Sequence, residues 1–227
     1  MQLHHSLVSL LVSPWSNWPA MSYKRPAYRL RLQAVQDQIA ACLDEANEGS
    51  LRVVSLCAGD GRDVMGVLES HERREDVRAW LVELDPKSVA AGIAARNDAG
   101  LGRYVIFIEG DATDFATYQG ILPADIVVVC GVWGHVPPDE RLMFVRALAK
   151  FCTPGASVVW SRGVDRGQAR YTDIQNLFEE NSFERVRDSV TSDDKWAICT
   201  HRYIGPATEV PTTGRIFNFH RKSGRKT

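Results

Sequence analysis

The sequence predicts an α/β protein with a doubly wound, mostly parallel sheet that ends in antiparallel strands. Five short apolar runs alternate with helical patterns, which is typical of a parallel sheet with right-handed crossovers. After residue 180 the alternation stops, and three strand-like runs follow that are separated only by turns or loops. The 227 residues are 44% hydrophobic and 24% charged, which supplies one large core and excludes disorder over most of the chain.

The first part of the chain is expected to be an arm followed by a helix. Residues 1–26 are rich in Trp, Ser and Pro and irregular in pattern. A helix is predicted over residues 29–47, because apolar side chains recur there at steps of three and four. We therefore divide the chain into an arm and helix that cover the site (1–48), a main domain (49–220) and a basic tail (221–227). The helical apolar residues are Leu32, Val35, Ile39, Leu43 and Ala46.

The elements of the main domain follow from local chemistry. Short runs rich in Val and Ile predict buried strands, since a strand covered on both faces needs no polar alternation. Asp85 and Pro86 read as an N-cap and first helical residue, and Pro137–Asp139 opens another helix. Strands are expected at 51–57, 77–84, 104–108, 125–130 and 156–160, then strand-like runs at 183–190, 196–203 and 215–219; helices are expected around 64–68, at 86–97, after 137–139 and at 168–180.

Composition narrows the function classes. The formal charge is −1, from 27 basic and 28 acidic residues, so no general attraction to nucleic acid is expected. Five widely spaced cysteines without a CxxC pair indicate neither a disulfide framework nor a thiolate zinc site, and they fit a reducing cytoplasm. The apolar run at 7–12 is far shorter than the ~20 residues of a membrane span and lacks a basic leader. No metal site is predicted.

The strongest local signal is a glycine loop after the first strand. Gly59 and Gly61 follow a buried strand and open a helix, so backbone N–H groups and the positive end of the helix dipole face a ligand. Glu83 ends the next strand and is placed to accept the hydroxyls of a ribose. A P-loop is excluded because no Gly-Lys-Ser/Thr follows.

Two nucleoside cofactor classes could use this loop. A dinucleotide loop needs a third glycine, and Val64 stands at that position. Asp60 and Asp63 would repel a pyrophosphate, whereas they would attract a cation or an amino group. S-adenosylmethionine carries a sulfonium and an ammonium and no phosphate, so the charge signs favour it over a nicotinamide cofactor. A tight turn without any ligand is the remaining alternative.

With these residues in view, the chain resembles the class I S-adenosylmethionine-dependent methyltransferases over roughly residues 51–203. Residues 54–63 resemble the family's first motif, 81–86 the second, 108–113 the third, and 125–131 the fourth strand, whose end faces the transferred methyl group. The antiparallel C-terminal strands agree with this family, and the resemblance implies its Rossmann-like fold with a seven-stranded sheet. The usual acidic residue of the first motif is absent, because Ser55 and Cys57 occupy the corresponding positions. No Asn/Asp-Pro-Pro-aromatic sequence follows the fourth strand, which lowers the expectation of an exocyclic or amide nitrogen as target.

The resemblance implies a set of residues that bind S-adenosylmethionine. Glu83 would hold the ribose, and the Asp111 side chain with the Ala112 backbone N–H would meet the adenine. Cys57 is expected to contribute only its backbone, and Asp60 or Asp63 would replace the missing anionic partner of the amino group. The cofactor-binding residues expected are Cys57, Ala58, Gly59, Asp60, Gly61, Asp63, Glu83, Leu84, Gly110, Asp111, Ala112, Cys130 and Gly131.

The loop after the fourth strand supplies the catalytic candidate. His135 lies five residues past Cys130, beside the expected methyl group, and an imidazole with its usual pKa of ~6.5 suits proton abstraction near neutral pH. Capping the helix that begins at Pro137 is the structural alternative. The substrate-binding residues expected are Tyr23, Arg25, Tyr28, Trp133 and Arg162, with packing or a solvated arm as their alternatives.

The sequence thus predicts transfer of a methyl group to an O or N of a small-molecule acceptor. An RNA methyltransferase is one alternative, although no basic face or RNA-binding module is evident. A non-catalytic cofactor-binding protein of the same fold is another. No nucleic-acid or membrane partner is expected, and the oligomeric state stays open.

Overall fold

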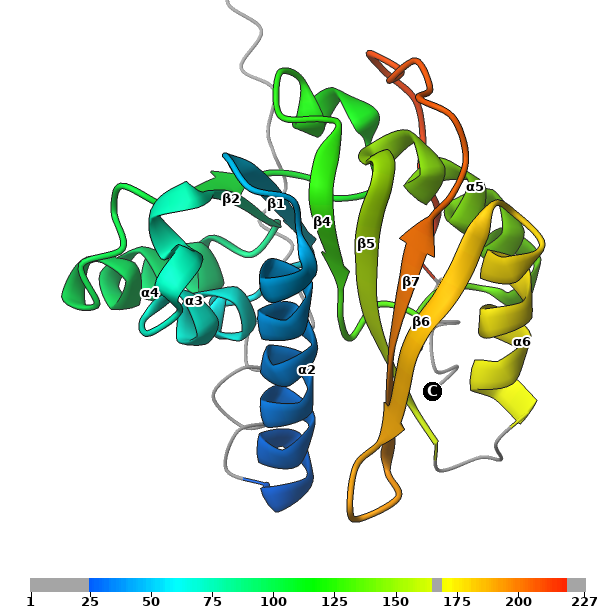
Figure 1. Cartoon of the computed structure of the whole chain (residues 1–227), viewed down its shortest axis with the longest axis horizontal. Coiled ribbons are helices and arrows are strands. Elements are labelled where there is room, and N and C mark those ends of the chain that lie inside the picture. The colour runs from blue at the N-terminus through cyan, green and yellow to red at the C-terminus, as the bar shows by residue number, and fades with distance from the viewer. Residues whose placement is uncertain (1–24, 165–168, 220–227) are drawn as a thin grey trace, which may run out of the picture.

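The computed structural model describes residues 25–164 and 169–219 (Figure 1). The predicted arm before residue 25 and the basic tail at 221–227 lie outside these residues. The helices are α2 (Pro26–Glu45), α3 (Arg62–Leu68), α4 (Pro86–Asp98), α5 (Arg141–Phe151) and α6 (Ala169–Glu179), with short 3-10 turns at Glu72–Asp76, Phe115–Tyr118 and Pro138–Glu140. The strands are β1 (Leu51–Leu56), β2 (Val77–Glu83), β3 (Val105–Glu109), β4 (Ala124–Val129), β5 (Cys152–Gly163), β6 (Phe183–Val190) and β7 (Trp196–Tyr203).

Within the described residues, seven strands form one sheet in the order β3-β2-β1-β4-β5-β7-β6. The first five strands pair in parallel, and β7 runs antiparallel between β5 and β6. The chain moves outward from β1 to β3 and then returns to place β4 on the other side of β1, so the strand order reverses between these two strands. Ligands of open α/β sheets bind at the carboxyl ends of the strands at such a point. The predicted fold class is confirmed.

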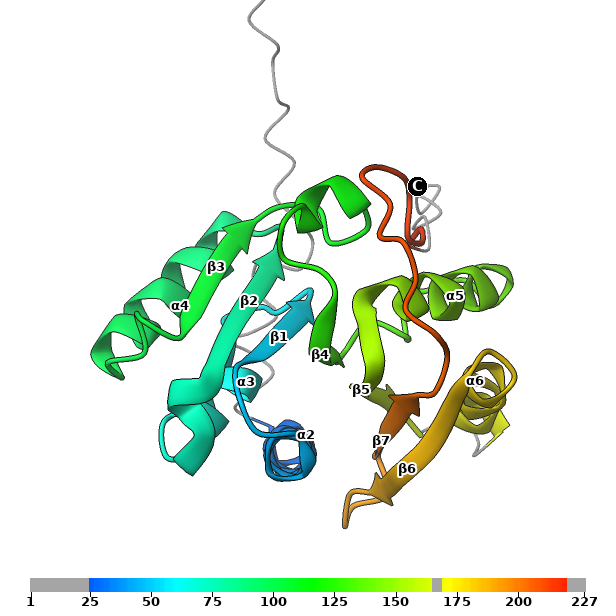
Figure 2. The same ribbon diagram turned by 45° about the horizontal axis from the view of Figure 1, so that its top comes forward.

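Helices cover both faces of the sheet (Figure 2). Along β1, Val53 packs into one core with residues of α2 and α3, whereas its neighbour Val54 packs into the other core with residues of α5 and α6. Successive side chains of a strand point to opposite faces, so an unbroken apolar run fills two cores at once. Among the described residues, no helix is both long and apolar enough to span a bilayer.

Helix α2 holds the start of the described chain against the sheet. Pro26 begins it, as suits a first helical position whose N–H needs no partner. The helix packs against α3 so closely that a Cβ on Gly66 would lie 2.2 Å from the side-chain amide nitrogen of Gln36. That nitrogen donates to the carbonyl of Arg62 at 2.9 Å. The contact fixes α2 beside the loop that leads into α3.

Most predicted elements lie within about three residues of their observed bounds, and two strands differ more. Strand β5 spans Cys152–Gly163 rather than 156–160, and an irregularity in the β4–β5 pairing accommodates Pro154 and Gly155 near its start. The prediction of a strand at 215–219 is wrong: only one isolated bridge, from Asp114 to Arg215, forms there. Ile216 and Phe217 are both fully buried, whereas a strand on one core would bury alternate residues.

An aromatic cluster fills the core between the sheet and the helices α5 and α6. Trp133, Trp160 and Phe178 pack with ring centroids 5.8–6.0 Å apart. His201 on β7 stacks on Phe178 at 4.6 Å, and its Nδ1 accepts a hydrogen bond from the indole of Trp160 at 3.1 Å. Nδ1 is therefore unprotonated, and the imidazole is neutral within this cluster.

Because of this burial, His201 is expected to make the protein less stable in acid. Burial, assisted by Arg185 and opposed by Asp188, lowers the pKa of His201 from 6.5 to about 3. Between these pH values the unfolded chain binds a proton that the folded protein does not, so the free energy of unfolding falls as the pH falls. At about 1.4 kcal/mol per pH unit, urea titrations at pH 7 and pH 5 should show a loss of about 2 kcal/mol from this residue.

The matched variant for this measurement is His201→Asn. Its side-chain oxygen can still accept from Trp160, but it does not titrate in this range. It should be less stable than the natural protein at pH 7 and should lose less stability on going to pH 5. If the free energy of unfolding fell by the same amount in both proteins between pH 7 and pH 5, His201 would not change its protonation on unfolding.

Candidate functional site

The loop after β1 forms the floor of a pocket at the carboxyl ends of the strands. Cys57, Gly59 and Gly61 all have positive φ angles, of 53°, 59° and 73°. A Cβ on Gly59 would meet nothing within 4 Å, whereas one on Gly61 would lie 2.5 Å from Leu81 and 2.8 Å from Phe107. Gly59 therefore opens the backbone toward the pocket, and Gly61 lets α3 start close against the sheet.

Glu83, at the end of β2, is held rigidly on the pocket wall. One carboxylate oxygen accepts from the backbone N–H of Gly59 at 2.9 Å, and the other accepts from Leu84 and Asp85, each at 2.8 Å. A carboxylate has about four acceptor sites, so at least one site remains for a ligand. Leu84 beside it is 60% exposed and lines the same pocket, which offers a flat ligand an apolar face.

The two acidic residues of the glycine loop have different roles. Asp60 is buried and accepts two hydrogen bonds of 2.9 Å from Arg62, so its charge is neutralised away from the pocket. Asp63 lines the pocket. Burial raises the pKa of Asp63, opposed by the backbone N–H of Val64 and by the nearby guanidinium of Arg31. Of the two, Asp63 is the one placed to meet a cationic ligand group.

Arg31 is a pocket residue that the sequence reasoning missed. It reaches from α2 to the end of the sheet, where its Nε donates to Ser161 at 3.2 Å and its guanidinium lies 5.1 Å from the ring centroid of Trp196. A sequence signal existed: Arg31 precedes the core residue Val35 by four positions, which places it on the buried face of the helix. Arg31 and Asp63 together present charges of both signs to one end of the pocket.

The loop after β3 forms the opposite end of the pocket, where Asp111 and Ala112 line it. One oxygen of Asp111 accepts from the backbone N–H of Thr113 at 2.9 Å and from its hydroxyl at 2.6 Å. Although partial burial raises the pKa of Asp111, hydrogen bonds from Thr113 and the ion pair with Arg215 outweigh it and lower the pKa overall. This carboxylate is therefore ionised at neutral pH and can accept N–H donors of a ligand.

The loop after β4 separates its residues between the pocket and the core. Gly131, Val132 and His135 line the pocket, and a turn joins the last two through a 2.8 Å hydrogen bond from His135 N to Val132 O. Trp133 is fully buried against Phe144, with ring centroids 4.7 Å apart. The expected substrate-binding role of Trp133 is therefore corrected: its side chain points into the core and anchors the loop.

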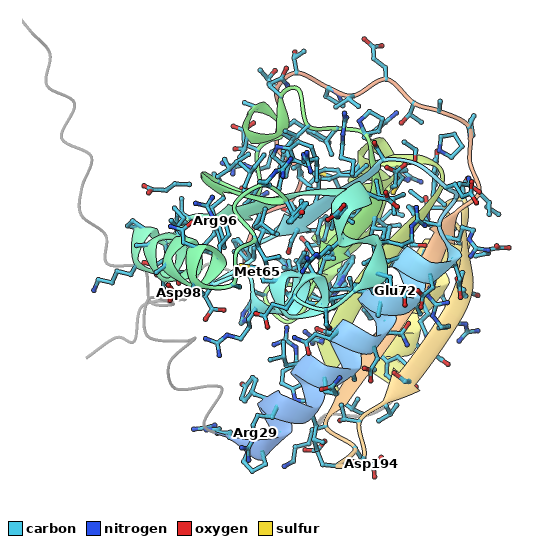
Figure 3. All side chains as sticks on the ribbon, turned by 60° about the vertical axis from the view of Figure 1, so that its left-hand side comes forward. Arg29, Met65, Glu72, Arg96, Asp98 and Asp194 are labelled. Atoms are coloured by element: carbon cyan, nitrogen blue, oxygen red, sulfur yellow. The ribbon has the colours of Figure 1, made fainter. Side chains whose placement is uncertain are left out.

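Arg25, Tyr28 and Arg162, which were also expected to bind the substrate, lie outside the pocket lining. Arg25 is exposed at the start of α2, and Tyr28 packs on Trp196 with ring centroids 5.4 Å apart. Arg162 lies beside Gly134, whose Cβ would be 3.0 Å from its guanidinium. Figure 3 shows Arg29 of α2 and Asp194 of the β6–β7 turn at the same end of the molecule, which agrees with the Tyr28–Trp196 contact. Tyr23 falls outside the described residues.

The predicted cofactor-binding residues thus fall into two groups. Asp60, Gly61 and Gly110 are outside the pocket lining, and Gly110 instead pairs its N–H with the carbonyl of Glu83 at 2.9 Å. Besides Arg31, the pocket takes in four residues that were not predicted: Asp85, Ser88, Val132 and Phe219. The predicted catalytic residue His135 lines the pocket, and the predicted cofactor-binding residues that line it are Cys57, Ala58, Gly59, Asp63, Glu83, Leu84, Asp111, Ala112, Cys130 and Gly131.

Neither pocket thiol is a nucleophile at neutral pH. Burial raises the pKa of Cys57 strongly, with Glu83 and Asp111 adding to the effect. Burial also raises the pKa of Cys130, to about 12. Only the thiolate form attacks electrophiles, so both residues contribute their backbone and shape. Within the described ranges no cluster of His, Cys, Asp or Glu is arranged to hold a metal ion.

Comparison with known proteins gives one family and many structures of the same fold. The family described as "Putative methyltransferase" matches residues 24–168. No curated protein sequence matches the chain. Magnesium protoporphyrin IX methyltransferase from Synechocystis PCC 6803, with bound S-adenosylmethionine, has a TM-score of 0.62 at 18% identity, covering 83% of this chain and 93% of that one.

Two further structures show how varied the proteins of this fold are. The 1,6-didemethyltoxoflavin-N1-methyltransferase of Burkholderia thailandensis, bound to its named substrate and S-adenosylhomocysteine, has a TM-score of 0.60 at 17% identity, covering 84% of this chain and 87% of that one. SpnF, a 4+2 cyclase, has a TM-score of 0.57 at 13% identity, covering 76% and 81%. At these identities the likeness establishes the fold alone.

Proposed function

The chain belongs to the class I S-adenosylmethionine-dependent methyltransferase family, and we propose that it transfers a methyl group from S-adenosylmethionine to an O or N of a small-molecule acceptor. The single observation that carries this proposal is the order of chemistry along the pocket. The strand order β3-β2-β1-β4-β5 puts Asp111 after β3 at one end and Glu83 with Leu84 after β2 next to it. Asp63 follows the β1 loop, and Arg31 contacts Ser161 of β5 at the other end. This order matches an adenine, a ribose and a zwitterionic amino acid.

The residues present fit this donor better than a dinucleotide. Asp63 would attract the ammonium of the methionine part and Arg31 its carboxylate, whereas a pyrophosphate at the same place would meet the negative charge of Asp63. The open space at Gly59 allows the ligand to approach the backbone closely. Residues on three successive strand ends would then hold the donor along its length.

His135 is proposed as the general base. In methyl transfer the acceptor attacks the methyl carbon in line as the sulfur leaves, and the protein mainly holds the two reactants in orientation. An acceptor hydroxyl or ammonium must lose a proton, and neutral His135 would take it from the side of the pocket formed by the β4 loop. The hydrogen bond from its backbone N–H to the carbonyl of Val132 fixes the backbone of His135 at the pocket wall.

A small-molecule acceptor is favoured by two neighbours whose named substrates are a porphyrin and a toxoflavin precursor. The near-neutral charge of the chain argues against RNA as the acceptor.

A cofactor-binding protein without methyl transfer is the second candidate, since a cyclase shares the fold at a TM-score of 0.57.

Thermal unfolding with added ligands tests the cofactor class. A ligand that binds only the folded protein raises the free energy of unfolding, by about 2.7 kcal/mol when its concentration is 100 times its Kd. The melting temperature rises accordingly with the ligand concentration. S-adenosylhomocysteine should raise the melting temperature more than 5′-methylthioadenosine, which lacks the charged amino acid. NAD⁺ should leave it unchanged. A shift with NAD⁺ alone would overturn the proposed function.

A further inference from the structure

The end of the described chain forms a strap, residues 214–219, over the loop after β3. The backbone N–H of Phe115 donates to the carbonyl of Gly214 at 2.9 Å, and the N–H of Ile216 donates to the carbonyl of Thr113 at 2.8 Å. Phe217 is fully buried against Phe144, with ring centroids 4.2 Å apart. The strap is therefore fixed by backbone pairing and by a core side chain.

The strap is also fixed at its far end, next to the pocket. Asn218 makes two hydrogen bonds to the carboxylate of Glu140, at 3.0 Å from its backbone N–H and at 2.7 Å from its side chain. The next residue, Phe219, lines the pocket. A segment about 100 residues distant in sequence from Asp111 thus contributes to the same wall (Figure 2).

Arg215 of the strap forms an ion pair with Asp111, the carboxylate at the end of the pocket where the adenine is proposed to bind. Its guanidinium donates to Asp111 Oδ2 at 2.9 Å and also to the hydroxyl of Thr113. That hydroxyl donates in turn to Asp111 Oδ1. Asp111 Oδ1 already accepts two hydrogen bonds, both from Thr113, so Oδ2 retains the acceptor site that is open to a ligand.

We propose that Arg215 is a positioning residue that fixes Asp111 to read the amino group of adenine, which makes the C-terminal strap part of the cofactor site. The inference rests on the proposed function. An Arg–carboxylate pair has a directional geometry, so it sets the orientation of the open Oδ2 site and not only its charge. Both side chains are about half exposed, at 51% and 46%, so the pair adds little to folding stability.

The test compares binding of S-adenosylhomocysteine with that of S-inosylhomocysteine, which presents a carbonyl oxygen in place of the adenine amino group. The natural protein should prefer the adenine ligand. Asp111→Asn should reduce this preference about tenfold, as expected for a hydrogen bond to a charged group. Arg215→Gln should reduce it about three- to fivefold, and the double variant should lose no more than Asp111→Asn alone.

The controls separate positioning from folding and from the proposed function. Arg215→Lys should recover part of the preference, and Arg74→Gln, an exposed arginine remote from the pocket, should leave it unchanged. The inference would be overturned if Arg215→Gln weakened binding of both ligands equally or left the affinity ratio unchanged. It would also be overturned if the natural protein bound the two ligands equally well. If the natural protein binds neither ligand, the proposed function itself fails.

Discussion

Replacing His135 by alanine is expected to lower kcat by about 100-fold or more while the affinity for S-adenosylhomocysteine stays within about twofold of the natural protein. The side chain lines the pocket on the β4 loop, away from the residues proposed to hold the ribose and the adenine. A general base contributes about 10²- to 10⁴-fold to a rate when the acceptor must lose a proton. Removing it should therefore change turnover and not donor binding.

Turnover is measured as release of S-adenosylhomocysteine with an acceptor identified from a small-molecule screen. The natural protein and His135→Ala are compared across the same pH range, and the variant should turn over more slowly throughout it. His71→Ala is the matched control, because His71 lies outside the pocket and caps a short turn through its bond to Arg73 N. Undiminished turnover in His135→Ala would return His135 to a structural role.

The sheet and the glycine loop could be predicted because their signals are local. The short apolar run Leu51–Leu56 before Gly59 is typical of a buried strand, and the positive φ angles of Gly59 and Gly61 need the residue type found there. Parallel strands place their carboxyl ends at one edge, so Glu83 and Asp111 were expected to meet, and both line one pocket. For these residues, order along the chain determines proximity in space.

The remaining pocket residues depend on tertiary packing that has no local signal. Trp133 was expected at the pocket because it lies in the same loop as His135, yet it packs against Phe144 in the core. Phe219 was expected in a strand, but burial of Ile216 and Phe217 docks its segment over the β3 loop instead. Which of two neighbouring side chains faces a ligand is decided by the elements that pack behind them.

The reach of Arg31 illustrates the same limit. Its position on the buried face of α2 could be inferred from Val35, but not the 3.2 Å contact with Ser161, 130 residues away. That contact also involves Gly131, whose N–H donates to the same hydroxyl at 3.2 Å. A Cβ on Gly131 would lie 3.3 Å from the guanidinium of Arg31, so the glycine leaves room for the arginine at the pocket.

Replacing Glu83 by glutamine is expected to weaken S-adenosylhomocysteine binding about 10- to 100-fold. A hydrogen bond to a charged group contributes about 1.5–3 kcal/mol, and each 1.4 kcal/mol is a tenfold change in Kd. The substitution keeps the shape of the side chain and removes its charge. It also presents an amide NH₂ to either the backbone N–H of Gly59 or the pair from Leu84 and Asp85, so at least one of these bonds is lost.

The ligand series identifies which part of the donor Glu83 holds. Since 5′-methylthioadenosine shares the ribose, its affinity should fall by the same factor, and its ratio to S-adenosylhomocysteine should stay constant. Glu109→Gln is the matched control: Glu109 pairs in register with Glu83 on the neighbouring strand but is exposed and outside the pocket lining. Calorimetric titration of both variants gives the comparison. Equal affinities for Glu83→Gln and Glu109→Gln would remove the ribose assignment, because a carboxylate that grips the sugar cannot lose its charge without loss of binding.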